Sequence, residues 1–411
     1  MVKSKKCETK TRKIMAMLQP TYRRNLYLLL AISFITAQPF WFAIEKLFYG
    51  SIGITAAGIG LILAFNNFYG FIFEFPSGVL ADRWGRKKSL ILYVMFSAIA
   101  CIALGKSTTV TMVVIAFSLW GLGRALSSGT FDAIMYDSLK ELGRKDEYEK
   151  YKRFSRLAFV AWAFISIFLG GVIANKYGFP MAYFSSGIVL LLGLPFVLLL
   201  KETTFHQKDK ILSTKKHFKD SFRYIFMHRK SIEYMIVIIV LSVSVITYWE
   251  YFPLQLTAIG IDSPIWQSRI MLLMPLIDVI GIITGFKFAK KFISKKYFWT
   301  AIFAMLVSYF VFATVHSYWA ILFFPIPTLV FSIIIVRLNA LINELIPSNI
   351  RASVNSAISL LEAAVSIIIM LSFGIIASRF SIFVALYSMA VLMTIYLIYY
   401  QLFAKDYLFD K

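Results

Sequence analysis

The sequence predicts an all-α membrane protein of about twelve transmembrane helices in two six-helix halves, with both termini on the cytoplasmic side. Three observations predict this fold: the composition, the length of the apolar runs, and the distribution of the basic residues. Hydrophobic residues make up 59% and charged residues 16% of the 411 positions, whereas soluble domains have about 45–50% and about 25%. Because the excess apolar surface has to avoid water, we expect the lipid bilayer to surround the protein.

The apolar runs are separated by polar segments, and each run is long enough to cross a bilayer, which takes about 20 residues. Helices are the expected structure because no water reaches the backbone inside the hydrocarbon core. In order, the runs predict helices over residues 25–47, 53–76, 89–105, 109–138, 154–175, 179–200, 232–255, 265–286, 298–315, 317–340, 351–377 and 380–403.

One polar connection is much longer than the others and divides six predicted spans from six. The predicted organisation is a cytoplasmic tail over 1–24, a six-helix half over 25–200, a cytoplasmic linker over 201–231, a second six-helix half over 232–404, and a cytoplasmic tail over 405–411. Within the linker, basic and aromatic residues alternate from His217 to Phe226. This stretch fits an interfacial amphipathic helix and a solvated linker equally well.

Basic residues gather on one side of the predicted bilayer. The first tail and the loops after the second, fourth and eighth predicted spans are rich in Lys and Arg. The opposite loops hold scattered single charges, namely Lys46, Lys106, Lys176, Arg269 and Arg379. This asymmetry predicts cytoplasmic termini and a multi-pass protein of the cell membrane, which in a bacterium is the cytoplasmic membrane. It also accounts for the net charge of +22 without a nucleic-acid partner.

The loop after the second predicted span carries the most specific motif of the chain. It reads Gly78-Val79-Leu80-Ala81-Asp82-Arg83-Trp84-Gly85-Arg86-Lys87-Lys88. The glycines permit close helix approach and a tight reversal. The aspartate can accept hydrogen bonds from amides at a helix N-terminus, and the second arginine can hold a carboxylate with two hydrogen bonds. The alternative is a generic basic loop between two spans.

This loop resembles the signature loop of the major facilitator superfamily at every defining position, and it lies at the same place in the predicted topology. The resemblance implies the fold of that family and a transporter of its drug-efflux-like subgroup. In the family the loop forms a charge cluster with an acid at the inner end of the fourth span, which Asp137 matches. The resemblance assigns a cytoplasmic gate to Gly78, Asp82, Arg83, Gly85, Arg86 and Asp137.

Ionisable residues inside the predicted spans are candidates for proton coupling, because a charge at bilayer depth is costly. Asp278, near the middle of the eighth span, is the first candidate, and Glu362 in the eleventh span is the second. Glu74 and Asp132 lie in the inner halves of the second and fourth spans. Arg124 resembles the buried arginine that the family associates with proton coupling. The alternatives are structural ion pairs or hydrogen bonds between helices, including a pair between Arg124 and Asp132.

Polar and aromatic residues inside the spans are candidates for substrate binding, since such a lining suits an amphipathic organic compound. The candidates are Gln38, Trp41, Asn66, Asn67, Tyr248, Trp249 and Glu250. The last three lie near the outer end of the seventh span, so an aromatic belt at the membrane interface is the competing interpretation.

Motifs for enzymes, nucleotides and metals are incomplete or absent in the sequence. Gly105-Lys106-Ser107 resembles the end of a phosphate-binding loop, but Ala100 stands where that motif requires glycine. The four histidines show no metal-ligand spacing. We therefore expect no cofactor, no metal and no nucleotide.

The expected function is secondary active transport, coupled to protons and exporting small amphipathic organic compounds. The alternatives are uptake or facilitated passage of a sugar, peptide or other metabolite. A membrane-embedded enzyme of lipid or glycan metabolism is the more remote alternative.

Overall fold

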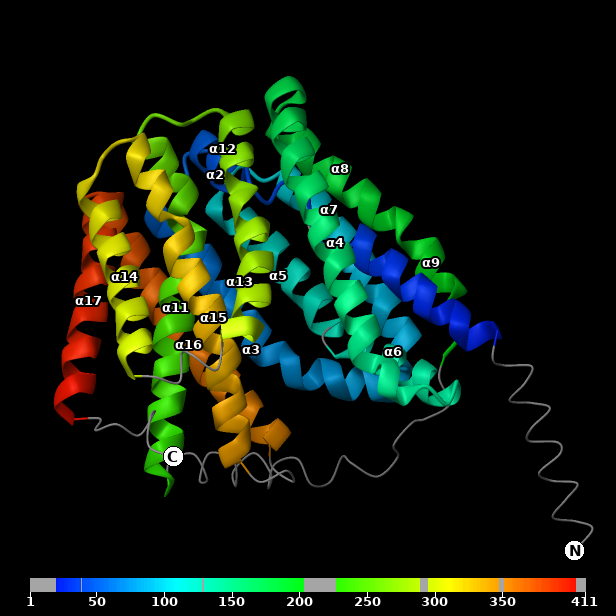
Figure 1. The fold of residues 1–411 in the computed structure, drawn as a ribbon. Helices are drawn as coiled ribbons and strands as arrows, with labels where there is room; N and C mark the ends of the chain where they lie inside the picture. The colour runs from blue at the N-terminus through cyan, green and yellow to red at the C-terminus, as the bar shows by residue number, and fades with distance from the viewer. Residues whose placement is uncertain are drawn as a thin grey trace, which may run out of the picture. The chain divides into compact units, whose positions relative to one another are not determined.

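The computed structural model describes residues 20–37, 39–127, 129–202, 227–288, 295–346 and 351–403, and every regular element among them is a helix (Figure 1). Nine helices in this described part of the chain are long and apolar enough to cross a membrane. The all-α membrane fold is thus confirmed, while the count of twelve spans and the cytoplasmic termini stay predictions. The stretch 217–226 lies outside the described residues.

The chain divides into two compact units, residues 1–42 with 69–209 and residues 43–68 with 210–411. The first unit contains a helix over residues 20–35, the second half of α3 (Ala56–Trp84), α4 (Arg86–Gly105), α5 (Val110–Ser127), α6 (Thr130–Glu141), the 3-10 helix η1 (Lys145–Glu147), α7 (Tyr148–Tyr177), α8 (Phe179–Leu192) and α9 (Leu194–Leu199). The second unit contains α2 (Glu45–Ser51), the first half of α3, α11 (Arg229–Ala258), α12 (Pro264–Met271), α13 (Leu273–Phe288), α14 (Lys295–Thr314), the 3-10 helix η4 (Tyr318–Phe323), α15 (Pro325–Leu345), α16 (Arg351–Arg379) and α17 (Ile382–Phe403).

The span predicted over 109–138 agrees with a candidate membrane span over Val110–Glu141, but its helix is interrupted. α5 ends at Ser127 and α6 begins at Thr130, with Gly129 before it at a φ of 69°. That left-handed conformation cannot continue a right-handed helix, and a residue with a Cβ adopts it only under strain. The break therefore falls at a glycine.

The first predicted span, 25–47, is divided as well. Its first helix ends at residue 35, and α2 begins only at Glu45. Pro39 lies between them and has no amide hydrogen with which to continue a helix. By their contacts, residues 43–68 group with the second unit.

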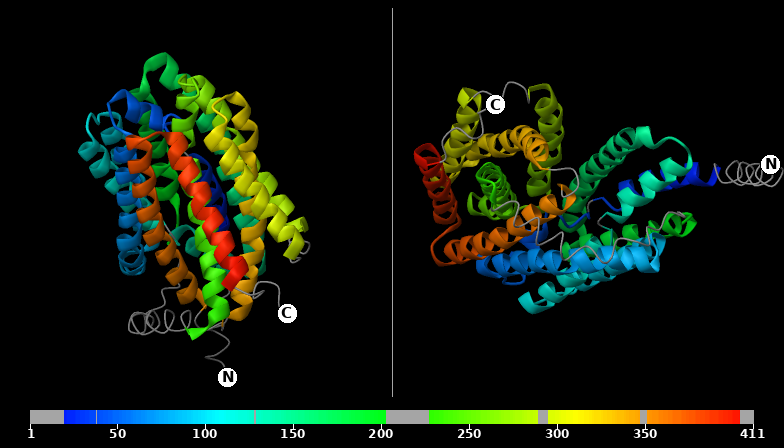
Figure 2. Two further views of the ribbon diagram at one scale, coloured as in Figure 1. Left: turned by 90° about the vertical axis from the view of Figure 1, so that its left-hand side faces the viewer. Right: turned by 90° about the horizontal axis from the view of Figure 1, so that it is seen from below.

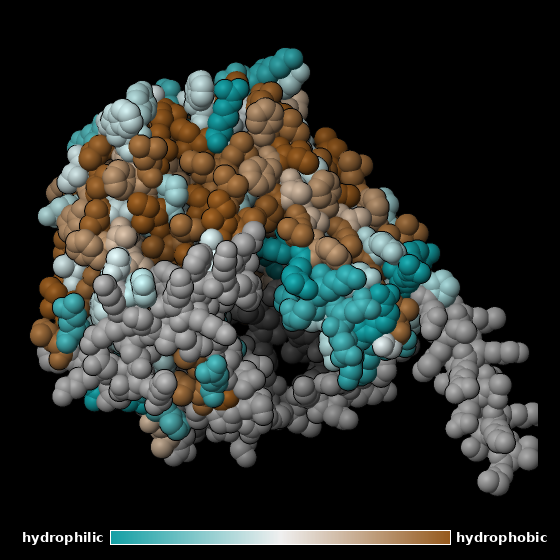
Figure 3. All heavy atoms as spheres, viewed as in Figure 1, coloured by the Kyte–Doolittle hydropathy of each residue, from teal (hydrophilic) through white to brown (hydrophobic). Residues whose placement is uncertain are grey.

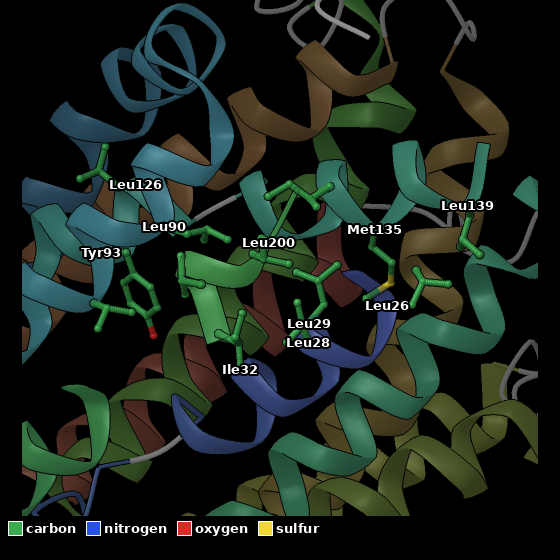
Figure 4. Packing of buried hydrophobic residues seen from close by; sticks show 13 residues of the cluster. Leu26, Leu28, Leu29, Ile32, Leu90, Tyr93, Leu126, Met135, Leu139 and Leu200 are labelled. Atoms are coloured by element: carbon green, nitrogen blue, oxygen red, sulfur yellow. The ribbon is translucent and has the colours of Figure 1, made fainter. Parts of the chain in front are cut away.

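The first unit packs around a hydrophobic core built from segments far apart in the chain (Figure 4). The helix over residues 20–35 contributes Leu26, Leu29 and Ile32, each at most 1% exposed. Their spacing of three residues places them on one face of the helix. They meet Leu90 of α4 and Leu139 of α6. This core holds together α4, which begins with Arg86 of the motif loop, and α6, which carries Asp137.

α11 is the central helix of the second unit. The right-hand view of Figure 2 shows it end-on, ringed by other helices of this unit, and α15, α16 and α17 all contact it. Within its most apolar stretch, 78% of the residues are buried. Polar side chains on α11 therefore lie inside the unit, where they need hydrogen-bonding partners.

The first half of α3 approaches α16 closely. A Cβ on Gly60 would lie 2.7 Å from the carbonyl oxygen of Met370, and a Cβ on Gly374 would lie 2.6 Å from that of Ala56. Glycine at both positions lets the two backbones come into contact. The close approach fastens α3 to the second unit at this end.

Hydrophobic side chains cover much of the described surface that Figure 3 shows. Hydrophilic side chains gather where α6 meets η1 and the start of α7, a region that includes Lys140, Arg144, Lys145 and Lys150. An apolar surface with charges at the helix ends is typical of a protein that spans a bilayer.

Candidate functional site

The motif loop forms the junction between α3 and α4 in the first unit. α3 ends at Trp84, Gly85 has a φ of 100°, and α4 begins at Arg86. Because that φ strains any residue with a Cβ, the reversal requires glycine. The side chains of residues 74–83 lie outside the description. For this reason the roles of three predicted gate residues stay predictions, namely those of Gly78, Asp82 and Arg83.

Arg86 at the start of α4 forms an ion pair with Asp137 of α6. The guanidinium Nη1 donates to Oδ2, and the two side chains are only 14% and 11% exposed. Solvent screens so buried a pair much less than a surface pair. The structure thus brings together two residues of the predicted gate, while the gating role itself stays a prediction.

Glu202 caps the N-terminus of α4. Its Oε1 accepts the amide of Arg86 and its Oε2 accepts the amide of Lys87, each at 2.9 Å. The first amides of a helix have no partner within the helix, and negative charge near them is favourable. The motif predicted such a role for Asp82. Glu202 is not evident from the sequence, because 116 positions separate it from Arg86 and no pattern connects the two.

The segment that ends in Glu202 is itself held by other parts of the first unit. Asn25 exchanges two hydrogen bonds with Lys201, donating from Nδ2 to its carbonyl and accepting from its amide at Oδ1, each at 2.9 Å. Lys87 Nζ donates to the carbonyl of Leu198 at 2.5 Å. Leu198, just before the predicted linker, and Glu202, near its start, are therefore both fastened to the motif loop.

Trp41 lies in a packed aromatic cluster of the first unit and is 4% exposed. It stacks on Tyr183 with ring centroids 5.4 Å apart, and the rings of Phe117 and Trp120 meet it edge-on at 5.8 and 5.5 Å. Its indole N–H donates to Cys101 Sγ at 3.4 Å. In this arrangement Trp41 contributes to the core, and its contact with a substrate stays a prediction.

A small cavity adjoins this cluster. Its lining includes Phe40, Trp120, Trp162 and Ser186, and its volume is about 10 Å³. A space of about 10–15 Å³ holds one water, whereas a pocket for a drug-sized compound takes about 300 Å³ or more. The lining of the cavity is aromatic, as expected for an amphipathic cargo, but the cavity is too small to hold a drug-sized compound. Gln38, also predicted to bind substrate, lies outside the described residues.

Asn66 and Asn67 lie on the half of α3 that belongs to the second unit, and both are half-buried. Asn67 Nδ2 donates to the carbonyl of Leu63 at 3.0 Å and lies 3.3 Å from Met370 Sδ. The Asn67 amide thus faces α16 inside the second unit, and the role of both asparagines in substrate binding stays a prediction.

Tyr248 and Trp249 of α11 are packed inside the second unit. Tyr248 is 1% exposed, and its ring lies 5.4 Å from Tyr309 and 5.0 Å from Phe312. Trp249 Nε1 donates to Thr328 Oγ1 of α15 at 2.6 Å. Tyr248 is therefore a core residue in this structure rather than part of an aromatic belt at the membrane interface.

The third residue of this group, Glu250, belongs to a charge cluster with Glu45 and Lys46 of α2. Lys46 Nζ lies 2.8 Å from Glu250 Oε2 and also pairs with Glu45 Oε2. The Tyr49 hydroxyl donates to Glu45 Oε1 at 2.8 Å. The side chains of Lys46 and Glu45 are only 5% and 6% exposed, and that of Glu250 is 31% exposed.

The sequence pattern placed Lys46 among the single charges of the outer loops, and the structure corrects this. Lys46 is a buried residue with two carboxylate partners. A signal was available, since Lys46 and the adjacent Glu45 both fall within the first predicted span, 25–47. The rule that singles out ionisable groups at bilayer depth applies to them as well.

The candidates for proton coupling have different environments. Glu362 of α16 is half-buried and shares a side-chain hydrogen bond with Ser242 of α11. Asp132 pairs with Lys152 of α7 at 3.1 Å, not with Arg124, and both partners are about half exposed. Arg124 is exposed. The side chains of the remaining two candidates, Asp278 and Glu74, lie outside the description.

Among the residues that the structure describes, no group of three His, Cys, Asp or Glu side chains could hold a metal ion. Several of the charged groups described above form ion pairs, and some of their carboxylates are buried. Such groups can bind protons and hold helices together, and they can change partners when helices move.

Comparison with known proteins agrees with these features. The family model described as Major Facilitator Superfamily matches residues 26–370. The inner membrane transport protein YajR of Escherichia coli (strain K12) is 28% identical over 145 residues, which are 34% of this chain. The matched stretch spans 30% of that relative's length.

Solved transporter structures share the fold over nearly the whole chain. The nucleoside transporter NupG superposes with a TM-score of 0.72 at 14% identity and covers 94% of this chain and 98% of its own. A bacterial homologue of the human lysosomal transporter Spinster, in an inward-facing and unoccupied conformation, has a TM-score of 0.71 at 13% identity. That likeness covers 95% of this chain and 96% of the other. At these identities the likeness concerns the fold alone.

Proposed function

The chain belongs to the Major Facilitator Superfamily, and we propose that it works as a proton-coupled secondary transporter that exports small amphipathic organic compounds. The family and the structural neighbours are transporters, so the protein is a transporter and not an enzyme. Its proposed partners are a small-molecule substrate, protons and the lipid bilayer of the cell membrane. The proposed mechanism is alternating access, in which two six-helix halves rock about a central binding site.

The position and surroundings of Glu362 are the observation that supports proton coupling. It lies eleven residues from the start of α16 at Arg351, which corresponds to a depth of about 16 Å in a helix that is long and apolar enough to span the membrane. Its hydrogen-bond partner Ser242 is neutral. A carboxylate that meets a neutral hydroxyl at bilayer depth is stabilised by taking up a proton, which makes it suitable as a coupling site.

The other predicted coupling residues, Asp278, Glu74, Asp132 and Arg124, remain part of the proposal. Asp132 has a half-exposed lysine partner, which favours a structural role for this acid. Gating is proposed for the motif loop together with Asp137. The buried pair of Arg86 with Asp137 supports a latch that closes the cytoplasmic side and opens during transport.

An amphipathic cargo is proposed from the aromatic character of the predicted lining around Trp41 and Tyr248. Export is the direction typical of the drug-efflux-like subgroup. Uptake or facilitated passage of a sugar, peptide or other metabolite is the second candidate. The half-buried amides of Asn66 and Asn67 favour it, because amides suit a cargo rich in hydroxyl groups.

The proposal is tested with purified protein in proteoliposomes under an imposed pH gradient, with cationic dyes, drugs and sugars as cargo. We expect at least one amphipathic cation to move against its gradient only when the pH gradient is present. Glu362→Gln should abolish this dependence, while Asp262→Asn, an exposed acid in the loop after α11, should leave it intact. Transport that ignores the pH gradient for every cargo would contradict proton coupling.

A further inference from the structure

Basic side chains from distant parts of the first unit meet at the end of α9. Arg24, on the helix over residues 20–35, donates from Nη2 to the carbonyl of Leu199 at 3.1 Å. Lys87 of α4 donates from Nζ to the carbonyl of Leu198 at 2.5 Å. Figure 1 shows the first of these helices, in blue, running beside α9. The last carbonyls of α9, which have no partner within their helix, thus hold two bases that are 175 and 111 positions away from their acceptors.

A third base, Lys201, adds to this pair. Its backbone amide and carbonyl are held by Asn25, each at 2.9 Å, and the residue is exposed, as is Arg24. A guanidinium has five N–H donors and an ammonium has three, so the carbonyls of α9 use only a part of them. The remaining donors suit a phosphate, because its oxygens accept strong hydrogen bonds from charged donors.

The positive charge at the end of α9 is not balanced by acids of the described residues. Arg23 and Lys88 adjoin the three bases in the sequence, and the ion pairs of the described part of the chain include none of the five. The acid next to them, Glu202, accepts the amides of Arg86 and Lys87. Even with this carboxylate counted, an excess of positive charge remains, and it attracts an anion.

An exposed apolar surface begins at the same place. Leu198 and Leu199, whose carbonyls hold two of the bases, are both more than half exposed. Leu192 at the end of α8 is similarly exposed. So is Tyr27, which lies three residues after Arg24 on one face of the same helix. Contact of these side chains with water is unfavourable, whereas the acyl chains of a lipid can cover them.

The combination of positive charge and apolar surface determines the kind of partner. A free phosphate ion would occupy the bases and leave the leucines uncovered. A neutral acyl chain would cover the leucines and leave the bases without an anion. An anionic phospholipid supplies the phosphate and the acyl chains in one molecule, and basic clusters at the ends of transmembrane helices bind such headgroups.

We propose that the end of α9, the start of α4 and the helix over residues 20–35 form a binding site for one anionic phospholipid. Arg24, Lys87 and Lys201 bind its phosphate, and its acyl chains lie on the exposed leucines of α8 and α9. A zwitterionic lipid binds more weakly, because the bases repel the cationic group of its own headgroup. The site involves neither cargo nor protons. Since the phosphate joins three segments, the bound lipid should stabilise the first unit.

Native mass spectrometry of the full chain in detergent tests this site. Phosphatidylglycerol and phosphatidylcholine with identical acyl chains are titrated into separate samples, and the mass of each complex counts the bound lipids. We expect the first phosphatidylglycerol to bind about tenfold more tightly than the first phosphatidylcholine, because several bases attract its net charge. Inorganic phosphate, added as a competitor, should not displace the lipid, because it lacks acyl chains.

Single substitutions locate the site. Lys201→Gln removes a base whose hydrogen bonds to Asn25 come from its backbone, so the fold should be unaffected. The affinity for phosphatidylglycerol should fall about fivefold, equivalent to about 1 kcal/mol. Arg24→Gln should weaken binding at least as much, whereas Arg24→Lys, which keeps the charge, should retain most of the affinity. The control Lys145→Gln removes an exposed base from η1 of the same unit and should bind as the wild type does.

Three results would overturn the lipid site. The first is equal affinity of the wild type for the two lipids. The second is an equal loss of affinity in Lys201→Gln and Lys145→Gln, because this would show a diffuse attraction to the whole basic side. The third is full displacement of the lipid by inorganic phosphate, which would assign the bases to a free anion. If Arg24→Gln is not recovered as folded protein, Lys201→Gln and its control still decide.

Discussion

Arg86 at the start of α4 pairs with Asp137 in α6, 51 positions further along the chain. The amide of the same Arg86 is accepted by Glu202, which follows α9. Two carboxylates thus fix the start of α4. Asp137 pairs with the side chain of Arg86, and Glu202 accepts a hydrogen bond from its backbone amide. Both carboxylates belong to the first unit, so the start of α4 is fixed from within that unit.

Asp137→Asn should destabilise the protein and impair transport. It leaves the guanidinium of Arg86 buried without its charge partner, which costs about 3–5 kcal/mol when one member of a buried pair is removed. Thermal unfolding in detergent and transport in proteoliposomes measure the two effects. The double variant Arg86→Gln with Asp137→Asn should recover much of the lost stability, because no unpaired charge remains. A double variant less stable than either single variant would contradict the pairing.

Asp82→Asn should impair transport without lowering the amount of protein in the membrane. This prediction follows from the resemblance of the motif loop to the family's gate. The variant keeps the size of the side chain and removes its charge, so insertion should proceed normally. Immunoblots of the membrane fraction and transport rates check the two statements, and full transport activity would be inconsistent with a gating role.

Glu202→Gln should lower the unfolding temperature of the protein. The carboxylate accepts two backbone amides at the N-terminus of α4, and a neutral amide group replaces one of its two acceptor oxygens with a donor. Loss of a hydrogen bond to a charged group costs about 1.5–3 kcal/mol. Glu147→Gln is a suitable control, since its carboxylate bonds to the partly exposed Arg144 three residues away. Equal effects of the two variants would argue against a special role of Glu202.

Gly170→Ala should disrupt the first unit. A Cβ at Gly170 would collide with the backbone of Phe40, which cannot move aside as a flexible side chain could. Overpacking of this kind costs about 1–3 kcal/mol or more. Gly70→Ala is the matched control, because that helical glycine has nothing within 4 Å of the added atom. It should gain about 1 kcal/mol of helix propensity. Monodispersity after gel filtration and thermal unfolding distinguish the two.

Trp41→Phe should reduce stability more than it changes the apparent affinity for cargo. The indole is buried, stacks on Tyr183 and donates to Cys101, so the smaller ring leaves a gap and an unmet contact, at a cost of about 1–3 kcal/mol. Trp319→Phe is the control, since Trp319 is 73% exposed. A large rise in KM with unchanged thermal stability would instead place Trp41 at the substrate.

Much of the fold was predictable from the sequence because a bilayer imposes a length and a composition on every segment that crosses it. Runs of about 20 apolar residues were enough to predict the nine helices of the described part of the chain that could cross a membrane. The breaks were less predictable. Gly129 and Pro39 are visible in the sequence, but many helices in membranes continue through such residues when neighbours satisfy the backbone.

The candidate site was predictable only in part. The motif loop singled out Arg86 and Asp137 through resemblance, and their pairing is now visible. The partners of Glu202 and of Lys46 were not predicted, for different reasons. Glu202 is one acid at the edge of a polar linker, and nothing local indicates that it reaches α4. Lys46 sits at the end of an apolar run, where a charged residue usually turns to water.

By itself the sequence determined that this chain is helical, lies in a membrane and carries the loop of a transporter family, because these properties depend on local composition and on short motifs. The tertiary structure alone decided which charges meet. Lys46 finds Glu250 more than 200 positions away, and Arg86 finds both Asp137 and Glu202. Ion pairs depend on distances of a few ångströms between helices, and only the packing of those helices sets such distances.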